Sequence, residues 1–277
     1  MKSIVSPTAT SITAPAAVQA PAPTFNTVAV VIVTYNAAAT IEWVLDRIPT
    51  TFSRSVGAIL VSDDASKDNT VEHAQSWADA HPDVPVTVVR QTKNRGYGGN
   101  QKFCYQWAIR LGFKQVVMIH GDGQYAPELA MAMVTPLLEN RADAVFGSRM
   151  MTRGGARRGG MPMYKFLGNR LLTTFQNVVS GLRLTEWHSG YRAYSTKVLS
   201  QLAFDSMADG FEFDTQIILG VKDAGGRFVE IPIPTYYGDE KCHVNGIQYA
   251  ADVLVDVVRY RSRRALGTST ESYANAA

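Results

Sequence analysis

Short apolar runs alternate with stretches of helical periodicity along the first half of the chain. Runs of apolar and β-branched residues that end in polar residues predict buried strands. The expected strands are Val28–Thr34, Val56–Val61, Val84–Val89, Gln115–Ile119 and Ala142–Phe146. Between them, apolar residues spaced three and four apart predict helices. These are Ala38–Ile48, a helix capped by Asp68 or Asn69 that runs to Ala80, Gly99–Leu111, and a helix from Pro127 to Asn140.

This alternation predicts an α/β fold with a mostly parallel central sheet flanked by helices, because parallel strands are joined by right-handed helical crossovers. In such sheets, ligands bind beyond the carboxyl ends of the strands. Each of the five strands is followed by a polar cluster. The clusters are Thr34–Asn36, Ser62–Ser66, Asn94–Asn100, His120–Tyr125 and Gly147–Arg149. Five such clusters on one edge favour a ligand site over five unrelated loops.

The second half of the chain has a less regular pattern. Helices are expected at Tyr164–Val179, Phe211–Lys222 and Ile247–Arg261, and a strand at Arg227–Ile233. The intervening segments read as a glycine- and arginine-rich loop, a polar and aromatic stretch, and a polar loop. These are Met151–Met161, Glu186–Tyr194 and Pro234–Asn245.

The two ends of the chain differ in composition from its middle. Residues 1–26 are rich in Ala, Pro, Thr and Ser and predict a disordered leader. Residues 265–277 predict a disordered tail in the same way, so that one domain is expected over residues 27–264.

Charge and cysteine content exclude several classes of function. The net charge of +3, from 27 basic and 24 acidic residues, is too small to indicate a nucleic-acid partner. Cys104 and Cys242 lack metal-ligand spacing, and Cys104 reads as a small core residue on a helix. No apolar stretch approaches the roughly 20 residues that span a bilayer. A protein of the reducing cytosol is therefore expected.

The common phosphate-binding loops are absent from the sequence. The turn after the first strand, Thr34–Ala39, contains no glycine, so its backbone cannot approach a pyrophosphate as dinucleotide-binding turns do. A glycine-rich loop ending in Lys-Ser/Thr is missing as well. A nucleotide bound here would need its phosphates held by a metal ion instead.

The segment His120–Tyr125 is the best candidate for that metal ion. Asp122 and Gln124 follow a buried strand and lie beside two glycines, which together offer hard oxygen ligands for Mg²⁺ or Mn²⁺. The cation would neutralise charge on a leaving diphosphate. Asp63 or Asp64 could accept hydrogen bonds from a base or ribose. The segment alone is equally compatible with a polar turn.

The ordered set of motifs resembles the inverting family 2 glycosyltransferases of the GT-A fold. Val31–Asn36 is similar to their first strand and loop, and Val61–Thr70 to their "DDxSxDxT" element. Asn94–Gly96 resembles "NxG", and His120–Gln124 takes the place of "DxDxQ". Within the family, Gly147–Arg149 and Ser189–Arg192 resemble the dolichyl- or polyprenyl-phosphate sugar transferases. The resemblance covers residues 27–240.

The resemblance implies a UDP- or GDP-hexose donor and a divalent cation, Mn²⁺ or Mg²⁺. The residues implied to bind the nucleotide are Thr34, Tyr35, Asn36, Asp63, Asp64, Asn94, Gly96 and Gly121. The implied metal ligands are Asp122 and Gln124. His120 departs from the family pattern, which has an aspartate there; its imidazole suits Mn²⁺ better than Mg²⁺, or could hydrogen-bond a phosphate.

The preferred acceptor is polyprenyl phosphate, an anion that needs cationic positioning and no general base. Arg149 and Arg192 resemble the phosphate-binding arginines of that branch, and Lys165 is a third candidate. A soluble glycan or small-metabolite hydroxyl would need a base, for which Glu212 and Asp214 are candidates. The same two acids are also favoured at a helix start for dipole reasons alone. Asp122 and Arg149 complete the predicted catalytic set.

Three further segments carry open alternatives. Asp239–His243 is either a loop that closes over the diphosphate or a solvated connector. His188 reads as a half-buried, hydrogen-bonded histidine rather than a ligand. The basic end of the last helix either meets anionic lipid headgroups or is simply solvated. The expected location is cytoplasmic, with peripheral contact at the inner face of a membrane or a soluble acceptor.

Two other classes of function remain at this stage. A sugar-1-phosphate nucleotidyltransferase shares the nucleotide-binding sheet, but carries a glycine-rich basic loop where this chain has Tyr35–Ala39. A non-catalytic nucleotide-sugar binding module is suggested by His120. Donor turnover separates these classes.

Overall fold

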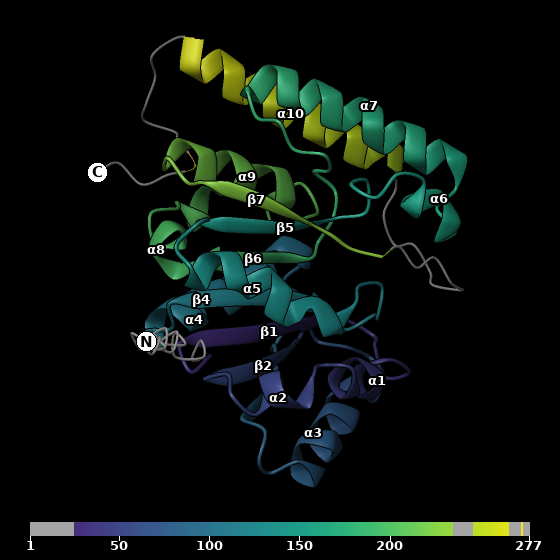
Figure 1. Cartoon of the computed structure of the whole chain (residues 1–277), viewed down its shortest axis with the longest axis vertical. Helices are drawn as coiled ribbons and strands as arrows, with labels where there is room; N and C mark the ends of the chain where they lie inside the picture. The colour runs from purple at the N-terminus through teal and green to yellow at the C-terminus, as the bar shows by residue number, and fades with distance from the viewer. Residues whose placement is uncertain (1–24, 235–245, 266–272, 274–277) are drawn as a thin grey trace, which may run out of the picture.

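The computed structural model describes residues 25–234, 246–265 and Tyr273 (Figure 1). The predicted loop over Asp239–His243 lies outside the described residues, as does most of the predicted leader and tail. No helix within the described ranges combines the length and apolar character needed to cross a bilayer.

A seven-stranded sheet in the order β3-β2-β1-β4-β6-β5-β7 forms the centre of the fold (Figure 1). Its strands are β1 Val28–Thr34, β2 Ala58–Asp63, β3 Val86–Arg90, β4 Gln115–His120, β5 Ala144–Ser148, β6 Arg192–Ser195 and β7 Phe228–Pro232. β6 runs antiparallel to β4 and β5, and the other pairs are parallel. The predicted α/β fold with a mostly parallel sheet is confirmed.

Strand β6 was not expected from the sequence. It covers the end of the polar and aromatic stretch Glu186–Tyr194 and extends to Ser195. This stretch has no alternating pattern, yet the side chains of β6 are largely buried between two neighbouring strands. Because β6 is reversed, the residues that precede it lie at the carboxyl ends of β4 and β5. The reversed strand therefore delivers Ser189 and Gly190 to the edge where the other polar clusters end.

Helices cover both faces of the sheet (Figure 1). They are α1 Ile41–Asp46, α2 Thr50–Ser53, α3 Thr70–Ala80, α4 Tyr97–Arg110, α5 Ala130–Leu138, α6 Gly155–Arg158, α7 Met163–Ser180, α8 Thr196–Leu199, α9 Phe213–Asp223 and α10 Gly246–Ala265. Pro127 begins a short 3-10 turn, Pro127–Leu129, which leads into α5. A short helix, α6, occupies part of the segment that was expected to be a loop.

The core consists of two apolar layers separated by the sheet. Along β1, Val30 and Ile32 face one layer and Val31 faces the other, which explains why the whole strand is apolar. Cys104 is buried in the second layer, where burial raises the pKa of its thiol to about 12. The expectation of a small core residue at this position is confirmed.

Candidate active site

The carboxyl ends of β2, β1 and β4 are neighbours, because β1 pairs with both other strands. Asn36, after β1, has a φ of 53°, and its backbone N–H donates to the Ser66 hydroxyl at 2.7 Å. The Asn36 side-chain oxygen accepts from the Lys67 N–H at 2.9 Å. Tyr35 beside it is exposed. The loops after β1 and β2 are thus fastened together, with Tyr35 facing solvent.

Asp63 and Asp64 organise these loops from inside. Asp63 has an exposed fraction of 0%, and its carboxylate accepts the Ser66 N–H at 3.0 Å and the Ser66 hydroxyl. Asp64 accepts the Arg95 N–H at 2.7 Å, and Asn94 donates to the Asp64 carbonyl at 3.2 Å. Burial raises the pKa of Asp64, while hydrogen bonds from the backbone N–H groups of Arg95 and Gly96 lower it. Asp63 and Asp64 thereby hold the predicted nucleotide-binding segments together at one edge of the sheet.

Gly96 and Gly121 occupy positions where a side chain would collide. Gly96 has a φ of +78°, and a Cβ there would lie 2.6 Å from the Asp209 carbonyl oxygen. A Cβ on Gly121 would lie 2.4 Å from Cγ2 of Thr34. The Gly121 carbonyl also accepts from the Thr40 hydroxyl at 2.6 Å. Gly96 is therefore required by the approach of the Asp209 backbone, and Gly121 by the Thr34 side chain packed against it.

Asp122 is the exposed carboxylate at the end of β4. Its Oδ1 accepts the Gln124 N–H at 3.0 Å, which fixes the turn. Gly123 has a φ of +76°, and the Trp43 ring fills the space of its missing side chain. Among the described residues, no group of three or more His, Cys, Asp or Glu side chains could enclose a metal ion. The site fits a cation that takes one carboxylate and completes its shell with phosphate oxygens and water, as Mg²⁺ does.

His120 faces inward from the end of β4. Its Nε2 lies 3.2 Å from the Tyr97 hydroxyl, and its ring meets the Tyr125 ring edge-on at 5.0 Å between centroids. Gly190 packs so closely on the imidazole that a Cβ would lie 2.4 Å from Nε2. Burial lowers the pKa of His120, although the neighbouring Asp122 raises it. Burial therefore favours the neutral imidazole, whose Nε2 is hydrogen-bonded to the Tyr97 hydroxyl.

Asp214, at the start of α9, lies in a buried polar network. Tyr97 donates its hydroxyl to the Asp214 carboxylate at 3.2 Å, and the Gln101 amide donates at 3.2 Å. The Arg192 guanidinium lies 3.3 Å from the same carboxylate. Tyr97 thus connects His120 at the end of β4 with Asp214 on α9.

Arg192 is buried behind the carboxyl edge of the sheet. Its side chain is 1% exposed, and it donates to the carbonyls of Ser189 and Trp187 at 2.8 Å and 2.9 Å. It also donates to the Asp214 carbonyl at 2.9 Å. The guanidinium thereby holds α9 against the segment before β6, and the acceptor contact expected of Arg192 stays a prediction.

Arg149, which follows β5, is anchored by Glu186. Its backbone N–H and Nε donate to the Glu186 carboxylate at 2.7 Å and 2.9 Å, and its Nη2 donates to the same group and to the His188 carbonyl at 3.1 Å. Its side chain is 11% exposed, whereas that of Glu186 is fully buried. Burial raises the pKa of Glu186, but Arg149 outweighs burial and lowers it.

The remaining predicted residues, Lys165 and Glu212, lie at the starts of two helices. Lys165 is a partly buried residue in the first turns of α7. Glu212, at the N-cap of α9, is partly exposed beside Gly210. Tyr97, Gln101, Tyr125 and Glu186 have further contacts with these residues. Tyr97 and Tyr125 lie in the predicted polar clusters, and Glu186 begins the polar and aromatic stretch, but sequence reasoning gave none of the four a role.

Because His188 is buried, we expect the stability of the fold to depend on pH. Its Nδ1 lies 2.8 Å from the Tyr249 hydroxyl, and its Nε2 is buried without a hydrogen-bond partner among the described residues. Burial lowers its pKa from 6.5 to about 4, although Glu186 opposes this change. The unfolded chain therefore takes up the proton first, so His188 stabilises the fold above pH 6.5 and loses that contribution as the pH falls toward 4.

We expect the variant His188→Asn, whose amide can still bond Tyr249, to lose less stability than the wild type on acidification. Urea denaturation at about pH 7 and about pH 4.5 measures the difference. Equal losses in both proteins would show that His188 is not buried in its neutral form.

Comparison with known proteins identifies the family to which this chain belongs. Residues 29–203, more than half of the chain, match the profile of the family described as Glycosyl transferase family 2. The chain is a member of glycosyl transferase family 2. Family membership confirms the glycosyltransferase predicted from the motifs and sets aside the sugar-1-phosphate nucleotidyltransferase.

Similar sequences and structures include proteins with described activities. The undecaprenyl-phosphate mannosyltransferase of Micrococcus luteus is 29% identical over 206 residues, which are 73% of this chain and 81% of that protein. The polyprenol monophosphomannose synthase of Mycolicibacterium smegmatis is 29% identical over 205 residues, 74% and 75% of the two chains. Glucosyl-3-phosphoglycerate synthase of Mycobacterium tuberculosis, solved with Mn²⁺, UDP and glucosyl-3-phosphoglycerate, superposes with a TM-score of 0.64 at 19% identity, over 85% of this chain and 80% of that one. This last similarity confirms the GT-A fold.

Proposed function

We propose that this family 2 glycosyltransferase moves a hexose from a UDP- or GDP-linked donor to polyprenyl phosphate, with a divalent cation and with inversion. One observation carries the proposal. Asp122 follows His120, whose ring packs edge-on against Tyr125 at 5.0 Å. The Tyr125 hydroxyl accepts the Gly190 N–H at 2.8 Å, and two residues earlier the His188 carbonyl accepts from Arg149 at 3.1 Å. One edge of the sheet therefore carries two complementary groups. The carboxylate suits a diphosphate bound to a metal ion, and the guanidinium suits a phosphate acceptor.

The donor half of the site is formed by the ends of β1, β2 and β4. Tyr35, Asn36 and Asn94 supply exposed surface for the nucleotide, while Asp63 and Asp64 hold the loops in place. Asp122, with Gln124 beside it, would hold the cation, and a bound cation would supply charge neutralisation for the leaving diphosphate. His120 is assigned a positioning role, because its Nε2 is engaged with Tyr97.

The acceptor half is formed by Arg149 and its anchor. A lipid phosphate is already an anion, so Arg149 needs only to orient one phosphate oxygen toward the anomeric carbon of the donor sugar. That oxygen forms the new C–O bond as the bond to the diphosphate breaks, and the nucleoside diphosphate leaves with the bonding electrons. A single displacement of this kind inverts the anomeric carbon. The names of the two relatives from Micrococcus luteus and Mycolicibacterium smegmatis support this acceptor class.

A hydroxyl acceptor is the second candidate, because an acid stands at the start of α9. The Asp214 carboxylate is already engaged with Tyr97, Gln101 and Arg192. Glu212 is partly exposed and is the better placed base of the two. The name of the synthase from Mycobacterium tuberculosis, which refers to phosphoglycerate, makes a small phosphorylated acceptor a reasonable alternative substrate.

The test is transfer of radiolabel from UDP- and GDP-hexoses, with Mn²⁺, to a short-chain polyprenyl phosphate or to 3-phosphoglycerate. We expect label in the lipid phosphate and slow donor hydrolysis when the acceptor is omitted. Donor binding without any turnover would contradict the proposal and favour a binding module.

Arg149 offers a separate test of the acceptor half. Removing this arginine alone would leave the buried Glu186 unpaired and destabilise the protein, so we choose the double variant Arg149→Gln with Glu186→Gln, which retains hydrogen-bonding groups. We expect the KM for the lipid phosphate to rise at least about tenfold, since each charged hydrogen bond contributes about 1.5–3 kcal/mol. Donor hydrolysis should change little. Equal loss of both activities would argue against an acceptor role.

A further inference from the structure

A row of apolar side chains faces outward along α7. These residues recur at intervals of three, four and seven, so they share one side of the helix. They are Met163, Tyr164, Leu167, Leu171 and Val178, and the last two are 73% and 77% exposed. A surface helix usually presents charged residues on its outer side, and a continuous apolar row there marks an interaction surface.

Helix α10 adds a second exposed row, Leu254, Val255 and Val258. α7 and α10 lie against each other, and both rest on α9 (Figure 1). The Gln176 amide of α7 donates to Thr215 of α9 at 3.1 Å, and the Gln216 amide of α9 donates to Asp256 of α10 at 2.8 Å. The inner sides of both helices are thereby fixed. We call the two outer rows together the α7–α10 face.

The charges around the α7–α10 face are mostly basic. α7 contains no acidic residue, and it contributes Lys165 and Arg170. The short helix α6, just before it, ends in Arg157 and Arg158. α10 places Arg259 and Arg261 in its last turns. An apolar row bordered by cations is complementary to an anionic bilayer surface. A second copy of this chain would bring the same positive charges together, which opposes self-association.

The helix layer is bonded directly to the acceptor half of the site. Asn169 of α7 donates to the Glu186 carboxylate at 2.8 Å, and Glu186 holds Arg149. On α10, the Tyr249 hydroxyl lies 2.8 Å from Nδ1 of His188, whose carbonyl accepts from Arg149. The α7–α10 face and the proposed phosphate-binding arginine therefore belong to one connected structure.

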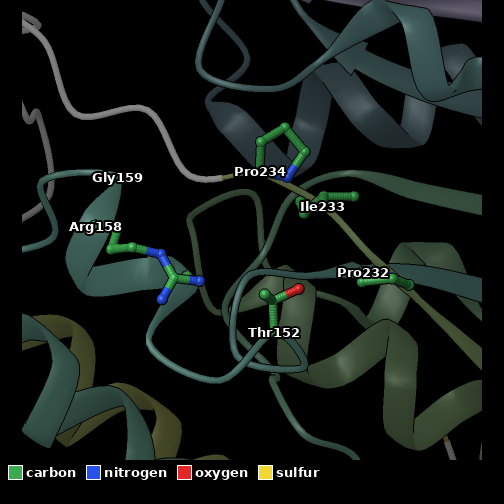
Figure 2. A pocket seen from close by; sticks show the side chains of 7 residues that line it. Thr152, Arg158, Gly159, Pro232, Ile233 and Pro234 are labelled. Atoms are coloured by element: carbon green, nitrogen blue, oxygen red, sulfur yellow. The ribbon is translucent and has the colours of Figure 1, made fainter.

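An open hollow of about 540 Å³ lies between α6 and the end of β7. Pro232, Ile233 and Pro234 line one side of the hollow, and Arg158 projects from α6 toward the loop that carries Thr152 (Figure 2). The wall thus offers apolar contact, and Arg158 adds a positive charge beside it. The hollow adjoins the same basic helix, α6, that precedes the α7–α10 face.

We propose that the α7–α10 face docks on an anionic bilayer, so that a lipid-phosphate acceptor reaches Arg149 from the membrane surface. The identity of the acceptor rests on the proposed function. The docking itself does not, because it requires only the exposed apolar rows and the cations beside them. Membrane binding can therefore be measured without sugar transfer.

The test is co-sedimentation of the full chain with vesicles of phosphatidylcholine, alone or mixed with phosphatidylglycerol. We expect binding to the mixed vesicles, and a loss of at least about tenfold in the double variant Leu167→Glu, Leu171→Glu, because each carboxylate removes apolar contact and adds repulsion. The matched control is Leu111→Glu. Leu111 is 61% exposed at the end of α4, which is not one of the two helices of the α7–α10 face, and this variant should bind like the wild type.

Two further measurements separate the possible failures. The double variant should keep its thermal stabilisation by UDP or GDP with Mn²⁺ and its activity on a water-soluble short-chain lipid phosphate, while losing activity on acceptor embedded in vesicles. Absence of vesicle binding by the wild type would overturn the docking proposal and leave the transferase proposal intact. A wild-type dimer in light scattering that the double variant converts to monomer, with no vesicle binding, would assign the face to a second copy of the chain.

Discussion

Replacing Asp122 by alanine is expected to reduce the rate of sugar transfer to about 1% of the wild-type rate or less. Asp122 is exposed, and its described hydrogen bond only fixes the turn through the Gln124 N–H, so the fold should survive the substitution. The proposed cation would lose its carboxylate. A loss of several kcal/mol of transition-state stabilisation lowers kcat by at least about 100-fold. Radiolabel transfer with Mn²⁺ measures the change in rate.

The variant Asp122→Asn separates charge from geometry. Its amide oxygen can still accept the Gln124 N–H, but it carries no negative charge for a cation. We expect Asp122→Asn to resemble Asp122→Ala in kcat and in the loss of Mn²⁺-stimulated donor binding, while its melting temperature stays near that of the wild type. Full activity of either variant would remove the metal assignment from this position.

The second large effect is expected on stability, from the variant Arg192→Met. The Arg192–Asp214 pair is almost fully buried at 3.3 Å, so loss of the arginine leaves a buried carboxylate without its countercharge. Breaking one partner of a buried ion pair costs about 3–5 kcal/mol. Urea denaturation should report this as a lower midpoint at an unchanged slope.

Two controls test whether charge is the cause. The double variant Arg192→Met, Asp214→Asn should recover part of the lost stability, because no charge is then left unpaired in the core. The variant Arg227→Met breaks an exposed pair with Asp143 and should change the midpoint far less. If Arg192→Met unfolds at the same urea concentration as Arg227→Met, the buried pair does not stabilise the fold as described.

The first half of the fold could be predicted in detail because its pattern is local. Each strand up to β5 is a short apolar run between helices, and the structure places those strands within two residues of their expected starts and ends. The main shifts lie in the helices. The segment from Ala38 forms a turn first, since Ala37 donates to Thr70 and α1 begins only at Ile41.

The acceptor half was harder to predict because its contacts are distant in sequence. Arg149 and Arg192 look alike as exposed cations in a motif, yet one borders the site and the other is buried. What separates them is the partner of each, Glu186 and Asp214, which no local pattern identifies. Strand β6 was missed for the same reason, since burial between two neighbours, and not alternation, makes it a strand.

The reversed strand β6 has a consequence for how motion could spread through the protein. In the described sheet, β5 and β7 connect to β4 solely through these four residues, Arg192–Ser195. Fraying of β6 would uncouple the acceptor half from the donor half while β1 to β4 stay paired. The four-residue strand β6 thus lies between the proposed donor and acceptor sites, where local opening would admit or release one substrate while the other site stays folded.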